Sequence, residues 1–269
     1  MIRQLAERAY FVLCLALGRL LRSARYSKAW IVHQDGDPST GSASSRASSR
    51  DGCQVRKRRV FYAPLLVWLG GALVRILDTG MRVLPQREWE ERERSIYRST
   101  YDASIRIVDG TLVLPCLAGE TLATLLEDPK IEEPVRKKAI ERAVVALAEF
   151  HRLGFTHADA MAENVMVDLD AGVARWFDFE TLHDSSRPMA WRCADDVRAL
   201  LVTCLVRTAA EKHATTLECI VDAYANTDVA RVLATSFTSV WRRSLTFHLA
   251  QAGLSFHSFR EVGCLLTRR

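Results

Sequence analysis

Apolar residues recur at helical spacing in several segments of the chain, and this pattern predicts most of its helices. Pro64 suits the first turn of the earliest one, whose leucines keep roughly to one face. A longer helix carries its apolar residues on one stripe and ends at Gly154. The expected helices span residues 64–77, 87–100, 121–128 and 134–153, with further helices from residue 195 onward, the longest over residues 194–212.

Two pairs of short β-rich runs predict two hairpins. Residues 104–108 and 111–115 flank an Asp-Gly dipeptide, which is a strong turn signal. Residues 165–167 are expected to pair with residues 174–177 across a second glycine-containing turn. Because the chain combines long helices with a few short strands, the expected fold class is α+β.

Charge and composition set the beginning of the chain apart. Residues 1–60 carry 12 Lys and Arg against 4 Asp and Glu, whereas the remainder carries 25 against 28. Residues 35–52 are rich in Ser, Gly and Asp and predict a flexible linker. Residues 1–34 form a basic, partly apolar arm ahead of it. This arm suits an anionic membrane surface or nucleic acid, or is solvated charge.

The apolar segments are too short to span a bilayer. Residues 10–17 and 60–74 both fall below the roughly 20 apolar residues that a transmembrane helix needs. No small-residue cleavage site follows the N-terminus, so a removed signal peptide is not expected. Leu5, Ala9 and Leu13 recur at helical spacing, which fits a helix packed on the protein itself or one lying in a membrane interface. The charge run at residues 55–59 is too short to predict nucleic-acid binding.

The cysteines predict neither a disulfide framework nor a zinc site. They form no Cys-x-x-Cys pair, and their spacing fits no zinc-binding pattern. An odd, scattered set indicates reduced thiols in a cytosol. The seven are Cys14, Cys53, Cys116, Cys193, Cys204, Cys219 and Cys264.

The residues with candidate chemistry lie between the long helix and the end of the second hairpin. A loop reads His-Ala-Asp at residues 157–159 and reaches Asn164, and the hairpin after it ends in Asp-Phe-Glu at residues 178–180. Asn164 and Asp178 are 14 residues apart, a separation that one hairpin can close. Taken singly, Asp159 and Asn164 also suit turns, and Asp178 also suits a helix cap.

In this order, the residues resemble the C-terminal lobe of the protein-kinase-like phosphotransferases, with a catalytic loop followed by a magnesium-binding motif. FHRLGFTHAD resembles the helix end and loop of the smaller members, which include bacterial lipopolysaccharide-core sugar kinases and aminoglycoside phosphotransferase relatives. LPQREWEERE leans toward the lipopolysaccharide kinases. The resemblance covers residues 82–212, about half of the chain.

The resemblance implies ATP and Mg²⁺ as cofactors and gives particular residues a role. Asp159 would orient the attacking hydroxyl, and His157 would brace the catalytic loop. Asn164 and Asp178 would be the metal ligands, because Mg²⁺ takes hard oxygen ligands and keeps several waters.

Other residues would support this site from neighbouring helices. Glu93 would pair with the lysine that binds phosphate, with Glu90 and Glu91 as rivals for that role or as a solvated helix face. Asp195 or Asp196 would begin the helix that anchors the catalytic loop from below.

Several positions depart from the family pattern. No glycine-rich phosphate loop is evident, and no lysine lies between Lys57 and Lys130. Arg75, Arg82 or Arg87 would have to replace the phosphate-binding lysine, unless Lys57 serves in a divergent lobe.

The catalytic loop itself also departs from the pattern. Met161 and Ala162 stand where kinase loops usually have a lysine and a proline. The loop nevertheless keeps its base and both metal-ligand positions, which favours an enzyme over a protein that only binds.

These observations predict a two-lobed protein-kinase-like fold with a reduced, divergent N-lobe and a mainly helical C-lobe. Its expected parts are the arm (1–34), the linker (35–52), the N-lobe (53–115) and the C-lobe (116–269). The expected activity is ATP- and Mg²⁺-dependent phosphoryl transfer to a hydroxyl of a sugar or lipid-linked sugar, because little chain follows Asp178 before the next helix.

The expected partners are a small-molecule or glycolipid acceptor and, through the arm, a membrane surface. The expected location is the cytoplasm, at the inner face of the membrane. The alternatives are an inactive kinase-like binding module and a protein Ser/Thr kinase.

Overall fold

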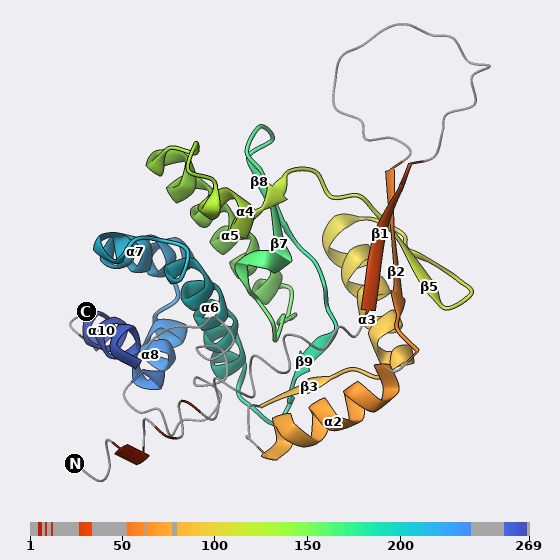
Figure 1. Cartoon of the computed structure of the whole chain (residues 1–269), viewed down its shortest axis with the longest axis horizontal. Helices are drawn as coiled ribbons and strands as arrows, with labels where there is room; N and C mark the ends of the chain where they lie inside the picture. The colour runs from red at the N-terminus through yellow and green to blue at the C-terminus, as the bar shows by residue number, and fades with distance from the viewer. Residues whose placement is uncertain are drawn as a thin grey trace, which may run out of the picture.

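A computed structural model describes residues 27–33, 53–61, 63–76, 80–237 and 256–267, with isolated positions at 5, 6, 9 and 12. The fold is mixed α+β, with long helices and several small sheets. Figure 1 shows a sheet with one helix across it on one side of the molecule and most of the other helices on the opposite side.

The largest sheet has four antiparallel strands in the order β1-β2-β5-β4. One of its faces is largely apolar around a lysine, because Val55 and Lys57 of β2 stand opposite Leu114 and Leu112 of β5. Residues opposite each other in an antiparallel pair share a face, so these four side chains point the same way. The strands are β1 (Ser27–His33), β2 (Cys53–Arg59), β4 (Arg106–Val108) and β5 (Thr111–Pro115).

The helix α3 (Gln86–Tyr101) covers the apolar face of this sheet (Figure 1). Its sequence is mostly charged, yet Trp89, Glu93, Ile96 and Tyr97 recur at a spacing of three to four residues and are all buried. Trp89 and Ile96 are fully buried in the same core as Leu112 and Leu114.

A short antiparallel pairing joins the strand that precedes α3 to a strand about 100 residues later in the sequence. The helix α2 (Ala63–Ile76) leads to β3 (Met81–Val83), which pairs with β9 (Thr181–His183). The Leu84 N–H also donates to the Glu180 carbonyl at 2.9 Å. The start of α3 is therefore fixed against the residues that follow Asp178.

The remaining elements build a helical core with a three-stranded sheet, β6-β7-β8, beside it. The long helix α5 buries an alanine, valine and leucine stripe and ends before Gly154, whose φ of 85° takes the left-handed conformation that closes helices. These elements are β6 (Glu120–Thr121), α4 (Leu122–Glu127), α5 (Glu133–Arg152), η1 (Ala162–Asn164), β7 (Val165–Asp168), β8 (Val173–Trp176), α6 (Met189–Leu205), η2 (Ala210–Lys212), α7 (His213–Tyr224), α8 (Thr227–Ser236) and α10 (Phe256–Thr267).

Most of the expected elements are confirmed, within a few residues at their ends. The helices α2, α3, α4 and α5 and both hairpins, β4–β5 and β7–β8, lie where the hydrophobic pattern predicts them. The helix expected over residues 194–212 is shifted, because α6 begins at Met189 and ends at Leu205. The expectation that Asp195 or Asp196 begins this helix is therefore wrong, and both lie buried inside it.

The strands β1 and β2 are the main elements that the sequence pattern did not predict. Residues 27–33 belong to the expected arm, yet they pair along their whole length with residues 53–59. The expected linker, residues 35–52, connects these two strands and lies outside the described residues, as does most of the arm. Among the described helices, none is long and apolar enough to cross a membrane.

The expectation that all cysteines are reduced is wrong for two of them. Cys53 and Cys116 form a disulfide, with their Cα atoms 5.6 Å apart. Cys53 begins β2 and Cys116 directly follows β5, so the antiparallel pairing of these strands brings together two cysteines separated by 63 positions. The two cysteines are too far apart in the sequence for their pairing to be predicted, whereas the β2–β5 pairing places them next to each other.

Removal of this disulfide should destabilise the fold. Closing a loop of this length lowers the entropy of the unfolded chain enough to contribute about 4 kcal/mol in the chain-entropy description. We expect the Cys53→Ser/Cys116→Ser variant to lose roughly 2–4 kcal/mol of unfolding free energy in a urea titration. The control is Cys264→Ser, at an exposed position, which should leave the stability nearly unchanged. Equal stability of the double variant and the parent chain would contradict this account.

Candidate active site

A single buried lysine is surrounded by three carboxylates. The Lys57 ammonium contacts the Asp178 carboxylate directly, lies 2.9 Å from Glu180 Oε1, and is 3.6 Å from Glu93 Oε1. Burial alone would lower the pKa of Lys57, but the three carboxylates outweigh it and raise the pKa above its ordinary value. Lys57 is therefore a permanent cation within a cluster that carries a formal surplus of negative charge.

The helix α3 supplies Glu93 to this cluster and holds its carboxylate in place. Glu93 is fully buried and accepts hydrogen bonds from the Trp89 indole at 3.1 Å and from the Phe179 N–H at 3.2 Å. Burial raises the pKa of Glu93, and the neighbouring Lys57 ammonium opposes that shift. Glu93 thus joins Lys57 of β2 to the segment that contains Asp178.

The two rivals of Glu93 lie elsewhere on the helix. Glu90 is hydrogen-bonded to Gln86 on the outer surface of α3, and Glu91 is exposed. Both therefore belong to a solvated face of the helix.

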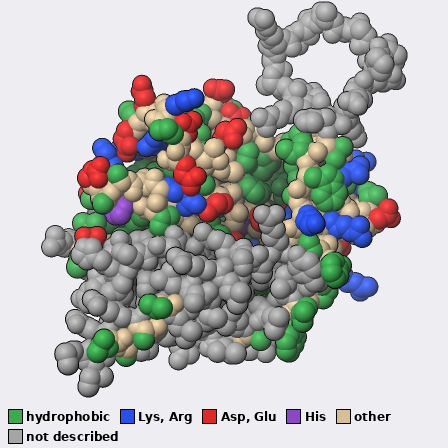
Figure 2. Space-filling model, viewed as in Figure 1, with side chains coloured by type: hydrophobic (Ala, Val, Ile, Leu, Met, Phe, Trp, Pro, Cys, Tyr) green, Lys and Arg blue, Asp and Glu red, His purple; other side chains and the backbone are tan. Residues whose placement is uncertain are grey.

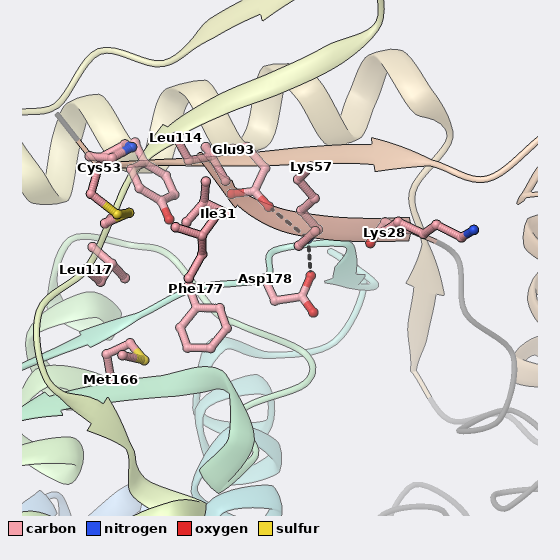
Figure 3. Close-up of a pocket in the computed structure, with 16 residues that line it drawn as sticks. Lys28, Ile31, Cys53, Lys57, Glu93, Leu114, Leu117, Met166, Phe177 and Asp178 are labelled. Atoms are coloured by element: carbon pink, nitrogen blue, oxygen red, sulfur yellow. Dashed lines mark hydrogen bonds and ion pairs between the residues drawn. A yellow bond between two sulfur atoms is a disulfide. The ribbon is translucent and has the colours of Figure 1, made fainter. Parts of the chain in front are cut away.

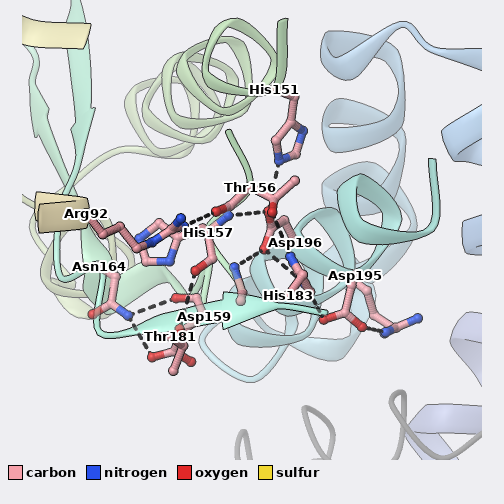
Figure 4. A network of polar contacts seen from close by, with 12 residues as sticks. Arg92, His151, Thr156, His157, Asp159, Asn164, Thr181, His183, Asp195 and Asp196 are labelled. Atoms are coloured by element: carbon pink, nitrogen blue, oxygen red, sulfur yellow. Dashed lines mark hydrogen bonds and ion pairs between the residues drawn. The ribbon is translucent and has the colours of Figure 1, made fainter. Parts of the chain in front are cut away.

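The loop between α5 and β7 brings Asp159 and Asn164 together (Figure 4). The Asn164 amide donates to the Asp159 carbonyl at 2.8 Å and to the Asp159 carboxylate at 3.1 Å. Because Nδ2 makes both of these bonds, Oδ1 of Asn164 faces away from Asp159 as an acceptor.

The β7–β8 hairpin returns the chain to this loop. Asn164 lies directly before β7, and the Phe177 N–H donates to the Asn164 carbonyl at 3.0 Å. Asp178 is the next residue and has a φ of 70°, a left-handed conformation that aspartate adopts more readily than most other non-glycine residues.

Asp196 of α6 anchors the loop from inside the protein (Figure 4). It is fully buried and accepts the N–H groups of His157 and Ala158, both at 2.7 Å. It also accepts the His151 Nε2–H at 2.9 Å. Ala158 is held at a φ of 66°, so Asp196 stabilises the second left-handed backbone position of the site.

Asp196 keeps its charge in spite of its burial. Burial would raise the pKa of this carboxylate, but His183, His151 and His157, all of them protonated at the acid pH where Asp196 titrates, and the His151 hydrogen bond lower it to well below the ordinary range. Burial likewise opposes the charge of His151, yet its hydrogen bond to Asp196 raises the pKa of His151 to about 9. These two residues form a buried ion pair beneath the loop.

The two other histidines near the loop stay neutral. Burial lowers the pKa of His157 and of His183 to about 4 in each case. His157 donates from Nε2 to the Phe177 carbonyl at 2.9 Å, and its ring lies against Phe179. His183 lies 2.9 Å from the Thr156 hydroxyl and 3.1 Å from the Asp195 carboxylate. Their contacts are to the protein itself, which suits a bracing role.

A cavity of about 730 Å³ opens beside the charged cluster (Figure 3). Lys57, Glu93 and Asp178 line it together with apolar side chains from both neighbouring sheets. This size and this mixture of apolar walls with a few convergent charges are typical of sites for small molecules and cofactors. The apolar lining includes Ile31, Val55, Leu114, Met166 and Phe177.

Asp178 at this cavity and Asn164 in the neighbouring loop offer oxygen donors of the kind that a hard divalent cation takes. The Asp178 carboxylate is 36% exposed, and Oδ1 of Asn164 is oriented as an acceptor. Mg²⁺ binds one or two protein oxygens and keeps several waters, so two such ligands fit it. Among the described residues, there is no group of three or more His, Cys, Asp or Glu side chains that could hold a metal ion together.

The residues predicted from the sequence thus lie in two connected groups. Asp159, Asn164 and His157 share the loop, while Asp178 and Glu93 share the cluster around Lys57. The Phe177–Asn164 backbone bond joins the two groups.

Two residues of the cluster were missed or underestimated in the sequence. Lys57 was named only as an alternative to the arginines, although it is the residue that meets Glu93 and Asp178, and Glu180 was given no role. Arg82 pairs instead with Glu88 at the surface, and Arg87 is exposed. The signal for Lys57 was the alternation in Cys53–Arg59, which places Val55 and Lys57 on one face of a strand.

Comparison with models of known protein families and with curated protein sequences finds no match to this chain.

The neutral histidines predict a loss of stability in mild acid. In the unfolded chain they protonate near their ordinary value of 6.5, whereas in the folded chain they protonate only near 4. The unfolded state therefore binds more protons between these values, and stability falls as the pH is lowered through that window. The His183→Asn variant removes one of these titrating groups, and its amide can still hydrogen-bond to a neighbour of His183. The unfolding free energy that the chain loses between about pH 7 and about pH 5 should therefore be smaller in this variant, by roughly 1–2 kcal/mol.

Urea titrations at both pH values measure this difference. The control is His213→Gln on α7, which removes a histidine but leaves the contacts of His183 intact. An identical loss in His183→Asn and the parent chain would show that His183 does not contribute to the acid sensitivity.

Proposed function

We propose that this chain is an ATP- and Mg²⁺-dependent phosphotransferase with a two-lobed protein-kinase-like fold. The observation that carries the proposal is the cluster in which Lys57 meets Glu93 and Asp178 at the wall of the 730 Å³ cavity. A lysine held by a helix glutamate and an aspartate that binds metal is the arrangement that phosphoryl transfer requires in kinases.

In this proposal the four-stranded sheet and α3 form the reduced N-lobe. The helices from α4 onward, with β6, β7 and β8, form the C-lobe. The adenine and ribose of ATP would occupy the apolar part of the cavity, between Val55 and Leu114 of the sheet and Met166 beyond it. The phosphates would extend toward Lys57.

Each polar residue then has a chemical task. Lys57 would bind phosphate oxygens, and Glu93 would hold Lys57 in position. Asn164 and Asp178 would hold Mg²⁺, which when bound neutralises the charge of the phosphates. Asp159 would accept a hydrogen bond from the acceptor hydroxyl at its carboxylate and orient that oxygen toward the γ-phosphorus. It would take up the proton as the new O–P bond forms and the bond between the γ-phosphorus and the bridging oxygen breaks, releasing ADP.

The acceptor that we propose is the hydroxyl of a small molecule, namely a sugar or a lipid-linked sugar. Only residues 179–188 separate Asp178 from α6, and part of this segment is paired with β3. So short and fixed a segment leaves little surface on which a peptide could dock, which argues against a protein Ser/Thr kinase.

One observation favours a second candidate, a kinase-like module that binds nucleotide without transferring phosphate. Met161 stands where a kinase loop usually carries a lysine that contacts the γ-phosphate. Such a module would bind ATP in the same cavity but would not turn it over.

Titration calorimetry with ATP and Mg²⁺ tests the proposal. The parent chain should bind ATP in a Mg²⁺-dependent manner, and Asp178→Asn should bind at least about tenfold more weakly because a charged metal ligand is lost. The matched control is Asp170→Asn at the exposed turn of the β7–β8 hairpin, which should bind like the parent. Absence of binding in a folded parent chain would contradict the proposal.

Turnover separates the two candidates. Asp159→Asn should bind ATP as the parent does, while its slow hydrolysis of ATP falls by on the order of a hundredfold. No hydrolysis of ATP by the parent, with intact binding, would instead support the module that only binds, and equal hydrolysis by both proteins would contradict the role of Asp159.

A further inference from the structure

An apolar stripe of α2 is exposed to solvent. Pro64, Leu65 and Trp68 lie on one face of this helix at a spacing of three to four residues. Leu65 is 58% exposed and Trp68 is 69% exposed, whereas Ala63 at the start of the helix is buried. A water-exposed leucine beside a water-exposed tryptophan on one helix face is unusual for a surface that has no partner.

A basic surface lies next to this stripe along the chain. In the β1–β2 pair, Lys28 stands opposite Arg58 and Trp30 stands opposite Arg56, so all four side chains share one face of the sheet. All four are exposed, and this face is opposite to the one that carries Lys57. Only residues 60–62 separate β2 from α2.

The two surfaces contain no acidic residue that would repel an anion. The described ranges 27–33, 53–61 and 63–76 hold no Asp or Glu, and Lys28, Arg56 and Arg58 are their cations on this face. Figure 2 shows basic side chains gathered over the sheet, with hydrophobic side chains following them toward α2. A cationic strand face thus continues into an apolar helix face.

We propose that this combined surface, formed by Lys28, Trp30, Arg56 and Arg58 of the sheet and by Leu65 and Trp68 of α2, docks on an anionic phospholipid bilayer. The cations would lie among the lipid phosphates, each contributing electrostatic attraction that acts close to the surface. Leu65 and Trp68 would enter the interfacial layer, where the amphipathic ring of tryptophan is favoured.

The composition of the surface selects a bilayer over other anionic partners. Nucleic acid would use the arginines and Trp30, but it offers nothing for an exposed leucine and proline on the adjoining helix. A second copy of this chain would cover the apolar stripe, yet it would bring the same unbalanced positive charge against the basic face. Anionic lipid satisfies both halves at once.

Docking here does not depend on phosphoryl transfer, because none of these six residues belongs to the charged cluster and only Lys28 among them also lines the cavity. It would nevertheless orient the enzyme, since the next element after α2 is β3, which pairs with β9, and β9 begins three residues after Asp178. A bilayer that binds α2 would then lie close to β3, the strand that precedes α3.

Co-sedimentation of the full chain with lipid vesicles tests the proposal. One set of vesicles consists of phosphatidylcholine alone, and the other also contains phosphatidylglycerol. The parent chain should bind the second set, and added salt should weaken the binding. Leu65→Ser/Trp68→Ser and Arg56→Glu/Arg58→Glu should each reduce the partition coefficient at least about tenfold.

Matched controls distinguish this surface from a general effect of the substitutions. Val145→Ser/Leu153→Ser removes exposed apolar side chains near α5, and Lys137→Glu/Lys138→Glu makes the same charge change on α5. Both should bind vesicles like the parent. Circular dichroism confirms that every variant is folded, and Trp68→Ser alone serves if the double variant unfolds.

Three results would overturn the proposal. The first is no binding to phosphatidylglycerol vesicles by the folded parent. The second is undiminished binding by both surface variants, which would assign the membrane contact to other parts of the chain. The third is a dimer, or binding to a DNA oligonucleotide, that the surface substitutions abolish while vesicles are ignored.

Discussion

The burial of Lys57 is the constraint on which the rest of the structure depends. An ammonium inside a protein is stable only with carboxylates around it, and here they come from α3 and from the segment after β8. The sheet, the helix and the hairpin must therefore meet at one point. Removing any one carboxylate would leave the others, but removing Lys57 would leave three buried or half-buried acids without their cation.

A second buried charge holds the lower half of the site. Asp196 fixes the backbone of His157 and Ala158 from inside α6, while the Phe177 N–H bonds the same loop to the hairpin. Arg92 adds a bond from α3 to the Thr156 carbonyl. The neighbours Arg92 and Glu93 thus connect one helix to both the loop and the Asp178 segment, which explains why a mostly charged helix is so firmly buried on one side.

The sequence predicted the parts of this site that are local in the chain. Asp159, Asn164 and Asp178 were found because one loop and one hairpin bring them together, and Gly154 marked the end of the helix before them. The burial of Lys57, which was named only as an alternative, and the Cys53–Cys116 pair were not predicted, because both depend on β2. Its residues VRKRR look like a charge run, and only pairing with β1 and β5 shows that Lys57 points inward while its arginine neighbours point outward. Long-range strand pairing leaves too faint a signal in a single sequence.

The central claim is that Lys57 is a phosphate-binding residue and not merely a buried counter-ion. The most direct measurement is the affinity of Lys57→Met for ATP and Mg²⁺, compared with Arg58→Met on the outer face of the same strand and with the parent chain, after circular dichroism shows all three to be folded. The account predicts that Arg58→Met binds like the parent and that Lys57→Met binds at least about tenfold more weakly. Equal affinity in all three proteins would contradict it.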